Sequence, residues 1–257
     1  FAGELVGWVV GSGGRVMSTS DGGDTWSAQQ STTSSPLHAV QAVSSSTAFA
    51  VGELGAVLFS GDGGATWLAR RPANHQDQHM LGLHFEDALT GWVVGTLGLV
   101  LFTEDAGLTW RLQRSGTATL HDVVVVDGGR GWAVGAQGVI LTTRNRGSSW
   151  VAQRSCTAAA TLYQVGGDPS GTWAWAVGQG GVVCYTPTSG AGSDDWWEQR
   201  TPDGIDLNSV ARVSVGSSQA QSQLWAAGDR GQLVTFAGAP PPPLPPSPPP
   251  PPSPPPP

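Results

Sequence analysis

The chain has 257 residues and a formal net charge of −7, with 12 basic residues against 19 acidic ones. This acidic balance argues against a nucleic-acid-binding protein, which needs a basic surface. No apolar run reaches the roughly 18 residues of a membrane-spanning helix, and two cysteines are too few for a disulfide framework.

A phrase of the form GWVVGTLGLVLFT recurs six times, and each copy combines two short apolar strands. The copies begin at Gly7, Ala48, Gly91, Gly131, Ala174 and Leu224. A period of about 40 to 50 residues built from short strands is typical of a β-propeller, in which each repeat forms one blade. The sequence therefore predicts an all-β propeller over residues 1–238.

Each repeat reads as four strands. The innermost strands are expected at residues 37–43, 80–85, 120–126, 162–165 and 207–213. The recurring phrase supplies the second and third strands, joined by a short Gly-x-x-Gly turn in which glycine accepts positive φ. Apolar residues in consecutive columns of the third strand, such as Val100 and Leu101, indicate that both of its faces are buried.

The two ends of the repeat region are incomplete. The first repeat lacks its innermost strand and the last lacks its outermost strand, so six blades are represented, either in an irregular ring of six or as part of a ring of seven. Residues 1–8 align with residues 85–92, so the sequence opens near the end of an innermost strand, as a processed or truncated product would. Cys184 occupies an apolar column and Cys156 a connection, and their spacing leaves a disulfide undecided.

The turn between the third and fourth strands carries a motif of the form Ser/Thr-x-Asp-x-Gly-x-Thr-Trp. An aspartate can accept turn N–H groups, the glycine can take positive φ, and the tryptophan can cover the turn. A fifth copy, ending at Trp196, has Ala191 and Ser193 in place of the Asp and Gly. We expect a structural role rather than a metal or catalytic one for the motif residues Asp21, Trp26, Asp62, Trp67, Asp105, Trp110, Asn145 and Trp150.

Tryptophan is abundant, and ten of the 12 fall in two repeat columns. We expect these columns to lie in the core, while Trp173 and Trp197 lie outside them and are candidates for surface contact.

An arginine recurs four residues after the motif tryptophan, at the end of the fourth strand. The set is Arg71, Arg114, Arg154 and Arg200, and Gln30 takes the position in the first repeat. Either each arginine pairs with the backbone or an acid of a neighbouring blade, or together they form a patch that binds carboxylates or an acidic peptide.

The start of each innermost strand lies at the axial mouth of a propeller. The residues predicted there are His38, His121, Tyr163 and Asn208, with His79 and His84 nearby. No cysteine or carboxylate spacing supports metal ligation by these histidines. A polar lining of the channel is therefore expected, with no metal and no cofactor.

The Ser/Thr-x-Asp-x-Gly-x-Thr-Trp motif resembles the Asp box of bacterial neuraminidase repeats, which implies a turn on the face opposite any active site. Sialidases with such boxes imply an arginine triad, a tyrosine and glutamate pair and an acid at the axis. The Arg-Ile-Pro motif is absent here, and Asp122 is the one acid expected on an inner strand. Because a glycosidase needs two facing carboxylates, a non-enzymatic protein without catalytic residues is expected.

The combined pattern of GWxVG, GxVLxT, DGGxTW and W-x-x-Gln resembles the photosystem II stability and assembly factor family of Asp-box propellers. The resemblance extends from Phe1 to about Gly238. It implies a non-enzymatic scaffold of the thylakoid lumen that holds a protein partner, a photosystem II subunit, through an arginine-rich surface.

The tail at residues 239–257 contains 15 prolines in 19 residues and is expected to form solvated polyproline II. Such Ser-Pro runs resemble the stalks of algal wall proteins. They keep open a rival function, that of a secreted propeller in the extracellular matrix or cell wall that binds glycan or protein.

Overall fold

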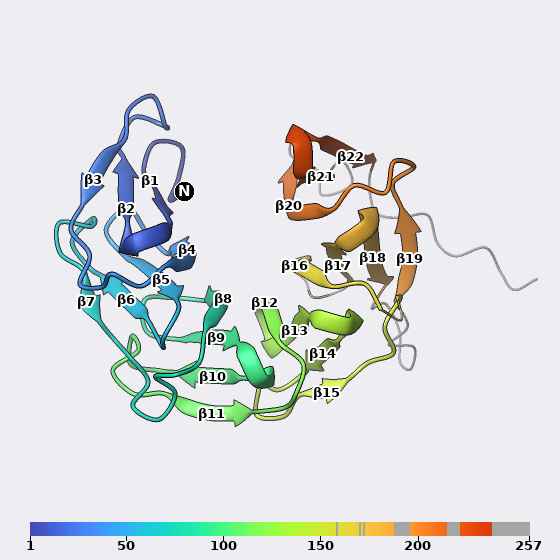
Figure 1. The fold of residues 1–257 in the computed structure, drawn as a ribbon, viewed down its shortest axis with the longest axis horizontal. Coiled ribbons are helices and arrows are strands. Elements are labelled where there is room, and N and C mark those ends of the chain that lie inside the picture. The colour runs from blue at the N-terminus through green and yellow to red at the C-terminus, as the bar shows by residue number, and fades with distance from the viewer. Residues whose placement is uncertain (158, 170, 172, 188–195, 215–221, 238–257) are drawn as a thin grey trace, which may run out of the picture.

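The computed structural model describes residues 1–157, 159–169, 171, 173–187, 196–214 and 222–237. Six antiparallel sheets follow one another along the chain and radiate from a common centre as propeller blades (Figure 1). The predicted all-β propeller is thus confirmed, while the tail at 239–257 lies outside the described residues. No helix in the described part of the chain has the length and apolar character needed to cross a bilayer.

Four blades have four strands and two have three. Blade 1 consists of β1 (Gly7–Val10), β2 (Val16–Thr19) and β3 (Ser27–Gln29). Blade 2 consists of β4 (Leu37–Ala42), β5 (Ala48–Gly52), β6 (Val57–Ser60) and β7 (Leu68–Ala69). Blade 3 consists of β8 (Met80–Phe85), β9 (Gly91–Gly95), β10 (Val100–Thr103) and β11 (Arg111–Arg114).

The same order continues through the second half of the chain. Blade 4 consists of β12 (Leu120–Val126), β13 (Arg130–Gly135), β14 (Ile140–Thr143) and β15 (Val151–Ala152). Blade 5 consists of β16 (Leu162–Gly167), β17 (Trp173–Gly178), β18 (Val182–Pro187) and β19 (Trp197–Arg200). Blade 6 consists of β20 (Leu207–Ser214), β21 (Ser222–Gly228) and β22 (Leu233–Ala237).

Short connections close the two ends of each blade. Most of the connections between second and third strands are 3-10 turns: η1 (Ser12–Gly14), η2 (Thr96–Gly98), η4 (Ala136–Gly138), η5 (Gln179–Gly181) and η7 (Asp229–Gly231). A further turn, η3 (Asp127–Gly129), joins the first two strands of blade 4. We call the surface formed by the connections between second and third strands the b–c face, and the opposite surface the Asp-box face.

The core lies between blades rather than inside any one of them. Successive residues of a strand face opposite neighbours: Trp92 packs in the cluster shared with blade 4, and Val93 packs in the cluster shared with blade 2. Val100 and Leu101 divide in the same way, which confirms the reading of consecutive apolar columns. Phe49 of blade 2 stacks on Phe85 of blade 3 with ring centroids 3.5 Å apart.

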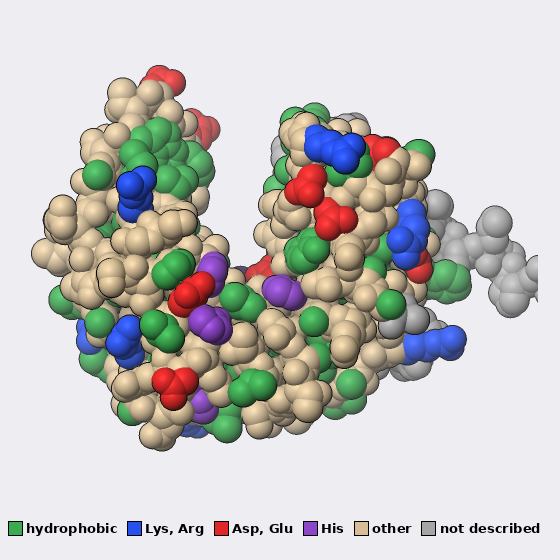
Figure 2. Space-filling model, in the orientation of Figure 1, with side chains coloured by type: hydrophobic (Ala, Val, Ile, Leu, Met, Phe, Trp, Pro, Cys, Tyr) green, Lys and Arg blue, Asp and Glu red, His purple; other side chains and the backbone are tan. Residues whose placement is uncertain are grey.

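The blades form an open arc, and a notch separates blade 1 from blade 6 (Figures 1 and 2). Val9 of blade 1 is 43% exposed and Trp225 of blade 6 is 39% exposed. The residues at the equivalent positions of the inner blades are buried, as Trp92 and Val93 are in blade 3. The expectation that all strand tryptophans are core residues is therefore wrong for Trp225, because no described blade covers it.

The two cysteines form a disulfide, with Cα atoms 5.9 Å apart. Cys156 lies in the connection that follows β15, and Cys184 lies in β18. The bond therefore ties the link between blades 4 and 5 to the third strand of blade 5, which the sequence alone left undecided.

Candidate partner-binding face

The Asp box of blade 2 is a closed network of short-range hydrogen bonds. Asp62 Oδ1 accepts hydrogen bonds from the Thr66 N–H (2.9 Å) and from Ser60 Oγ (2.9 Å), and Thr66 Oγ1 donates to Asp62 Oδ2 (2.6 Å). Ser60 Oγ also accepts the N–H of Gly64, whose φ is +87°. The hydrogen bonds, led by that of the Thr66 side chain, lower the pKa of Asp62. The carboxylate is thus engaged by its own turn.

The other boxes repeat this arrangement. Asp21 and Asp105 accept the same set of bonds from Thr25 and Thr109. In the fourth box, Asn145 Oδ1 accepts the Ser149 N–H (2.9 Å) and Asn145 Nδ2 donates to Ser149 Oγ (3.0 Å). Asparagine therefore replaces aspartate without loss of the turn, so the turn needs acceptor oxygens rather than charge. The degenerate part of the fifth box lies outside the described residues.

The box tryptophans of blades 2 to 5 each donate their indole N–H to the preceding blade, a contact that sequence reasoning missed. Trp67 Nε1 donates to Gln29 Oε1 of blade 1 (3.0 Å), and Gln29 Nε2 donates to the Gly63 carbonyl (3.2 Å). Trp150 and Trp196 donate in the same way to glutamines of the preceding blade, at 3.0 and 2.8 Å. Each acceptor lies three residues after the preceding box tryptophan, so the W-x-x-Gln pattern is an inter-blade latch.

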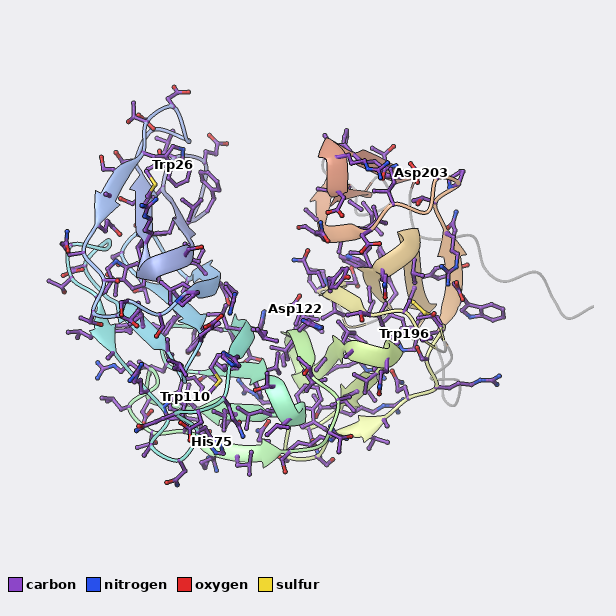
Figure 3. The ribbon with its side chains drawn as sticks, viewed as in Figure 1. Trp26, His75, Trp110, Asp122, Trp196 and Asp203 are labelled. Atoms are coloured by element: carbon purple, nitrogen blue, oxygen red, sulfur yellow. A yellow bond between two sulfur atoms is a disulfide. The ribbon has the colours of Figure 1, made fainter. Side chains whose placement is uncertain are left out.

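Burial differs among the box tryptophans. Trp67 is 2% exposed, whereas Trp26, Trp110 and Trp150 are only partly buried. Figure 3 shows Trp110 and Trp196 well away from the inner edge of the arc. The expectation that the whole column is core therefore holds fully for Trp67 and Trp196 and in part for the others.

The four repeated arginines lie where the outer strands end on the b–c face. Arg200 Nη1 donates to the Gly180 carbonyl at the tip of η5 (3.3 Å), and its Nε pairs with Glu198. Within the described part of the chain, Arg71, Arg114 and Arg154 have no ion-pair partner. Arg71 and Arg154 are exposed, and Arg114 is half-buried. Arg200 is therefore engaged by groups of its own blade, whereas the structure gives no such partner for Arg71, Arg114 or Arg154 within the described residues.

The axial residues form local polar pairs on the same face. His38 Nε2 lies 3.7 Å from Glu53 Oε1, and the His121 ring meets the Tyr163 ring edge to face at 5.9 Å between centroids. Tyr163 Oη donates to Asp206 Oδ2 (3.3 Å). Figure 2 shows histidine side chains near the middle of this face and arginine side chains around its periphery. Among the described residues, no three potential metal ligands come together.

Asn208 belongs to this lining and donates through Nδ2 to Asp229 Oδ1 (2.7 Å). His84, which the sequence placed near the mouth, lies instead towards the Asp-box end of its strand. It pairs in register with Trp92, near the other end of β8, and lines a cavity of about 400 Å³ with Glu86 and Arg146. Burial lowers the pKa of His84 to about 4, which leaves the imidazole neutral.

Asp122 lies at the inner edge of the arc (Figure 3) and bridges two blades. Its Oδ2 accepts the N–H of Val165 in blade 5 (3.0 Å). Gln164 holds the same strand position in blade 5, and its Oε1 accepts the N–H of Val210 in blade 6 (2.6 Å). Gln41, two residues further along its strand, joins blades 2 and 3 in a similar way, because its Oε1 accepts the N–H of Phe85 (2.7 Å). Burial raises the pKa of Asp122 to about 7, although the hydrogen bond opposes that shift. The carboxylate is thus part of the blade packing.

Sequence comparison finds one family whose pattern matches this chain. The family is described as photosynthesis system II assembly factor YCF48, and the match covers residues 1–72 and 72–154. No curated protein sequence matches the chain.

Solved structures resemble the fold at low sequence identity. A structure of YCF48 bound to D1 peptide has a TM-score of 0.69 at 20% identity, and covers 91% of this chain and 75% of that one. YCF48 from Cyanidioschyzon merolae has a TM-score of 0.70 at 19% identity, with 93% and 80% covered. An ancestral GH74 enzyme gives 0.62 at 12% identity, with 91% and 38% covered. These likenesses establish a shared propeller fold.

Proposed function

Because the chain belongs to the photosynthesis system II assembly factor YCF48 family, we propose that it is a non-enzymatic scaffold that holds a segment of a photosystem II subunit on its b–c face. The observation that carries this proposal is the set of Arg71, Arg114 and Arg154, which recur in three consecutive blades without an ion-pair partner in the described part of the chain.

Unpaired guanidinium groups on an acidic protein favour a partner that supplies carboxylates. Arginine offers a planar set of donors that matches a carboxylate in two parallel hydrogen bonds. Such contacts at a solvent-facing rim speed association and select the partner more than they add affinity. In the compared structure, YCF48 holds a D1 peptide. A D1 segment is accordingly the partner we propose for this chain, which would act at the thylakoid.

The arrangement of acids supports a scaffold rather than a hydrolase. A glycosidase needs two carboxylates that face each other across the bond to be cut. Asp122, the acid of an inner strand, is engaged by the Val165 N–H, and the box carboxylates are engaged by their own turns. The secreted, matrix-bound alternative rests on the proline-rich tail, which lies outside the described residues.

The test compares two triple variants that change the net charge equally. Replacement of Arg71, Arg114 and Arg154 by glutamate reverses the b–c rim. The control replaces Arg111, Arg144 and Arg146 on the Asp-box face by glutamate. Binding of a fluorescent D1 peptide is measured by anisotropy at low and high salt. We expect the rim variant to bind at least about tenfold more weakly, and the wild type to weaken as salt rises.

Equal affinity of the rim variant and the control would contradict the proposal. Melting temperatures of all three proteins are measured in parallel. A large drop in the rim variant alone would instead favour structural pairing of these arginines.

A further inference from the structure

The tips of the b–c connections share a backbone conformation that does not depend on their side chains. Each tip has a residue in the left-handed region, and in blades 1 and 5 that residue is glycine, Gly13 (φ +67°) and Gly180 (φ +68°). In blades 2 and 3 it is leucine, with φ of +53° at Leu54 and +57° at Leu97. Left-handed backbone is strained for a bulky residue and free of strain for glycine. The conformation of the turn therefore does not explain why blades 2 and 3 carry leucine at this position.

Both leucines present their side chains to solvent. Leu54 is 49% exposed and Leu97 is 56% exposed. The turns are held by backbone groups: the Gly55 N–H donates to the Gln78 carbonyl (2.7 Å), and the Gly116 N–H donates to the Leu97 carbonyl (2.8 Å). The leucine side chains are thus not needed to hold the turns and remain available for contact with another molecule.

The leucines lie beside the arginine rim. In blade 5 the arginine at the end of the outer strand reaches the carbonyl of the tip residue, as Arg200 and Gly180 show. Arg114 holds the same position in blade 3, and the N–H of Gly116, two residues later, bonds to Leu97. Blades 2 and 3 pack side by side through β4 and β8. Blades 2 and 3 therefore each carry one exposed tip leucine and one arginine without an ion-pair partner in the described part of the chain.

Two acids, Glu53 and Asp77, lie close to this surface. Glu53 precedes Leu54, and its Oε1 faces His38 Nε2 at 3.7 Å. Asp77 is exposed and precedes Gln78, whose carbonyl accepts the Gly55 N–H at the blade 2 tip. Arg71 and Arg114 lie at or just after the ends of the outer strands β7 and β11.

We infer that Leu54 and Leu97 are apolar anchors for the bound segment, and that this segment is amphipathic and acidic. Its apolar side chains pack on the two leucines while its carboxylates meet Arg71 and Arg114. The inference rests on the proposed function, since it assigns the chemistry of the partner at the same face. Exposed leucines beside unpaired cations match apolar and anionic groups on one polypeptide.

The experiment removes the anchors without straining the turn. Leu54 and Leu97 are both replaced by glycine, and the control variant carries Gln137→Gly, which relieves the same left-handed backbone (φ +58°) in blade 4 but removes a polar side chain. A second control, Leu108→Ala, removes an exposed leucine of the Asp-box face. The probes are three fluorescent model peptides of equal length, built from alternating Glu and Leu, Glu and Ser, or Lys and Leu.

We expect the wild type to prefer the Glu and Leu peptide over the other two. The double glycine variant should bind it roughly tenfold more weakly, as the loss of partly buried leucine surface implies. Its melting temperature should not fall, because relief of backbone strain offsets the added freedom of glycine in the unfolded chain. Both control variants should bind as the wild type does. Replacement of both leucines by asparagine, which tolerates left-handed backbone, should weaken binding equally and decides the matter if the glycine variant unfolds.

The outcomes separate the inference from the proposed function. If the leucine variants bind normally while Arg71→Glu with Arg114→Glu abolishes binding, the anchors are refuted and the arginine face stands. If the wild type binds the Lys and Leu peptide as tightly, the acidic character of the partner is refuted. If the arginine variant also binds normally, both ideas fall.

Discussion

Asp122 should make the stability of the propeller depend on pH in an unusual direction. Burial raises its pKa to about 7 in the folded protein, whereas an unfolded aspartate titrates near 3.9. Between about pH 4 and pH 7 the folded state therefore holds a proton that the unfolded state has released. The contribution of Asp122 is most favourable at low pH and is lost as the pH rises through this window. A shift of about three pH units corresponds to about 4 kcal/mol, an upper bound because the residue keeps some contact with water.

The variant that isolates this effect is Asp122→Asn. An asparagine keeps an oxygen that can accept the Val165 N–H and carries no charge, as Gln164 does at the equivalent position between blades 5 and 6. We expect the variant to exceed the wild type in unfolding free energy at pH 8 by up to about 4 kcal/mol. At pH 4 the two proteins should be about equally stable.

The comparison must be made as a difference between the two proteins. Burial lowers the pKa of His84 to about 4 in the folded protein, whereas an unfolded histidine titrates near 6.5. As the pH falls below about 6.5, the unfolded state therefore binds a proton on this histidine before the folded state does, and the free energy of unfolding decreases. This effect opposes that of Asp122 in the same pH window, but it is present in both proteins and cancels. Urea unfolding followed by tryptophan fluorescence at pH 4, 6 and 8 gives the required free energies. A variant less stable than the wild type at pH 8, or a difference that does not change with pH, would refute the reasoning.

Further predictions concern the boxes, the latches and the disulfide. Trp67→Ala should cost roughly 3 to 5 kcal/mol, as for other buried aromatics, while Asp62→Asn should leave the melting temperature nearly unchanged; the reverse order in thermal melts would disprove the structural role of the box. Gln29→Ala should cost about 1 to 3 kcal/mol in urea unfolding, because the buried Trp67 N–H loses its acceptor, and an unchanged midpoint would mean that water replaces it. Reduction of the Cys156–Cys184 disulfide, which spans 28 residues, should lower stability by roughly 3 to 4 kcal/mol; identical unfolding curves with and without reductant would exclude that contribution.

The repeat made the fold predictable, since each blade is encoded locally and copied. The innermost strands expected at residues 80–85 and 120–126 coincide with β8 and β12, and the two incomplete blades lie where the pattern placed them. The burial of residues in the terminal blades was not predictable from the repeat position alone. Trp225 occupies the same repeat position as Trp92 and is exposed because no described blade packs against it.

The site was predictable in position but not in its pairing. The recurring arginine indicated which end of the outer strands carries cations. Whether an arginine has an ion-pair partner depends on the other side chains of its own blade, as the pair of Arg200 and Glu198 shows. The inter-blade latch was visible as a W-x-x-Gln pattern, although nothing in the pattern said that the donor comes from the following blade. The left-handed leucines were hidden because a Gly-x-x-Gly turn suggests that glycine alone takes positive φ, whereas Leu54 and Leu97 take it as well.

Over the described residues, the open arc arranges the six blades as a linear array of coupled units. Blades 2 to 5 are each stabilised by two neighbours, while blades 1 and 6 have one covered flank each, and Val9 and Trp225 remain exposed on the other. In such an array stability is approximately a sum of unit and nearest-neighbour terms. Opening should therefore start at the two terminal blades and spread inward, so amide exchange should be slowest in β9 and β13 at the centre of the arc and fastest in β1 and β22.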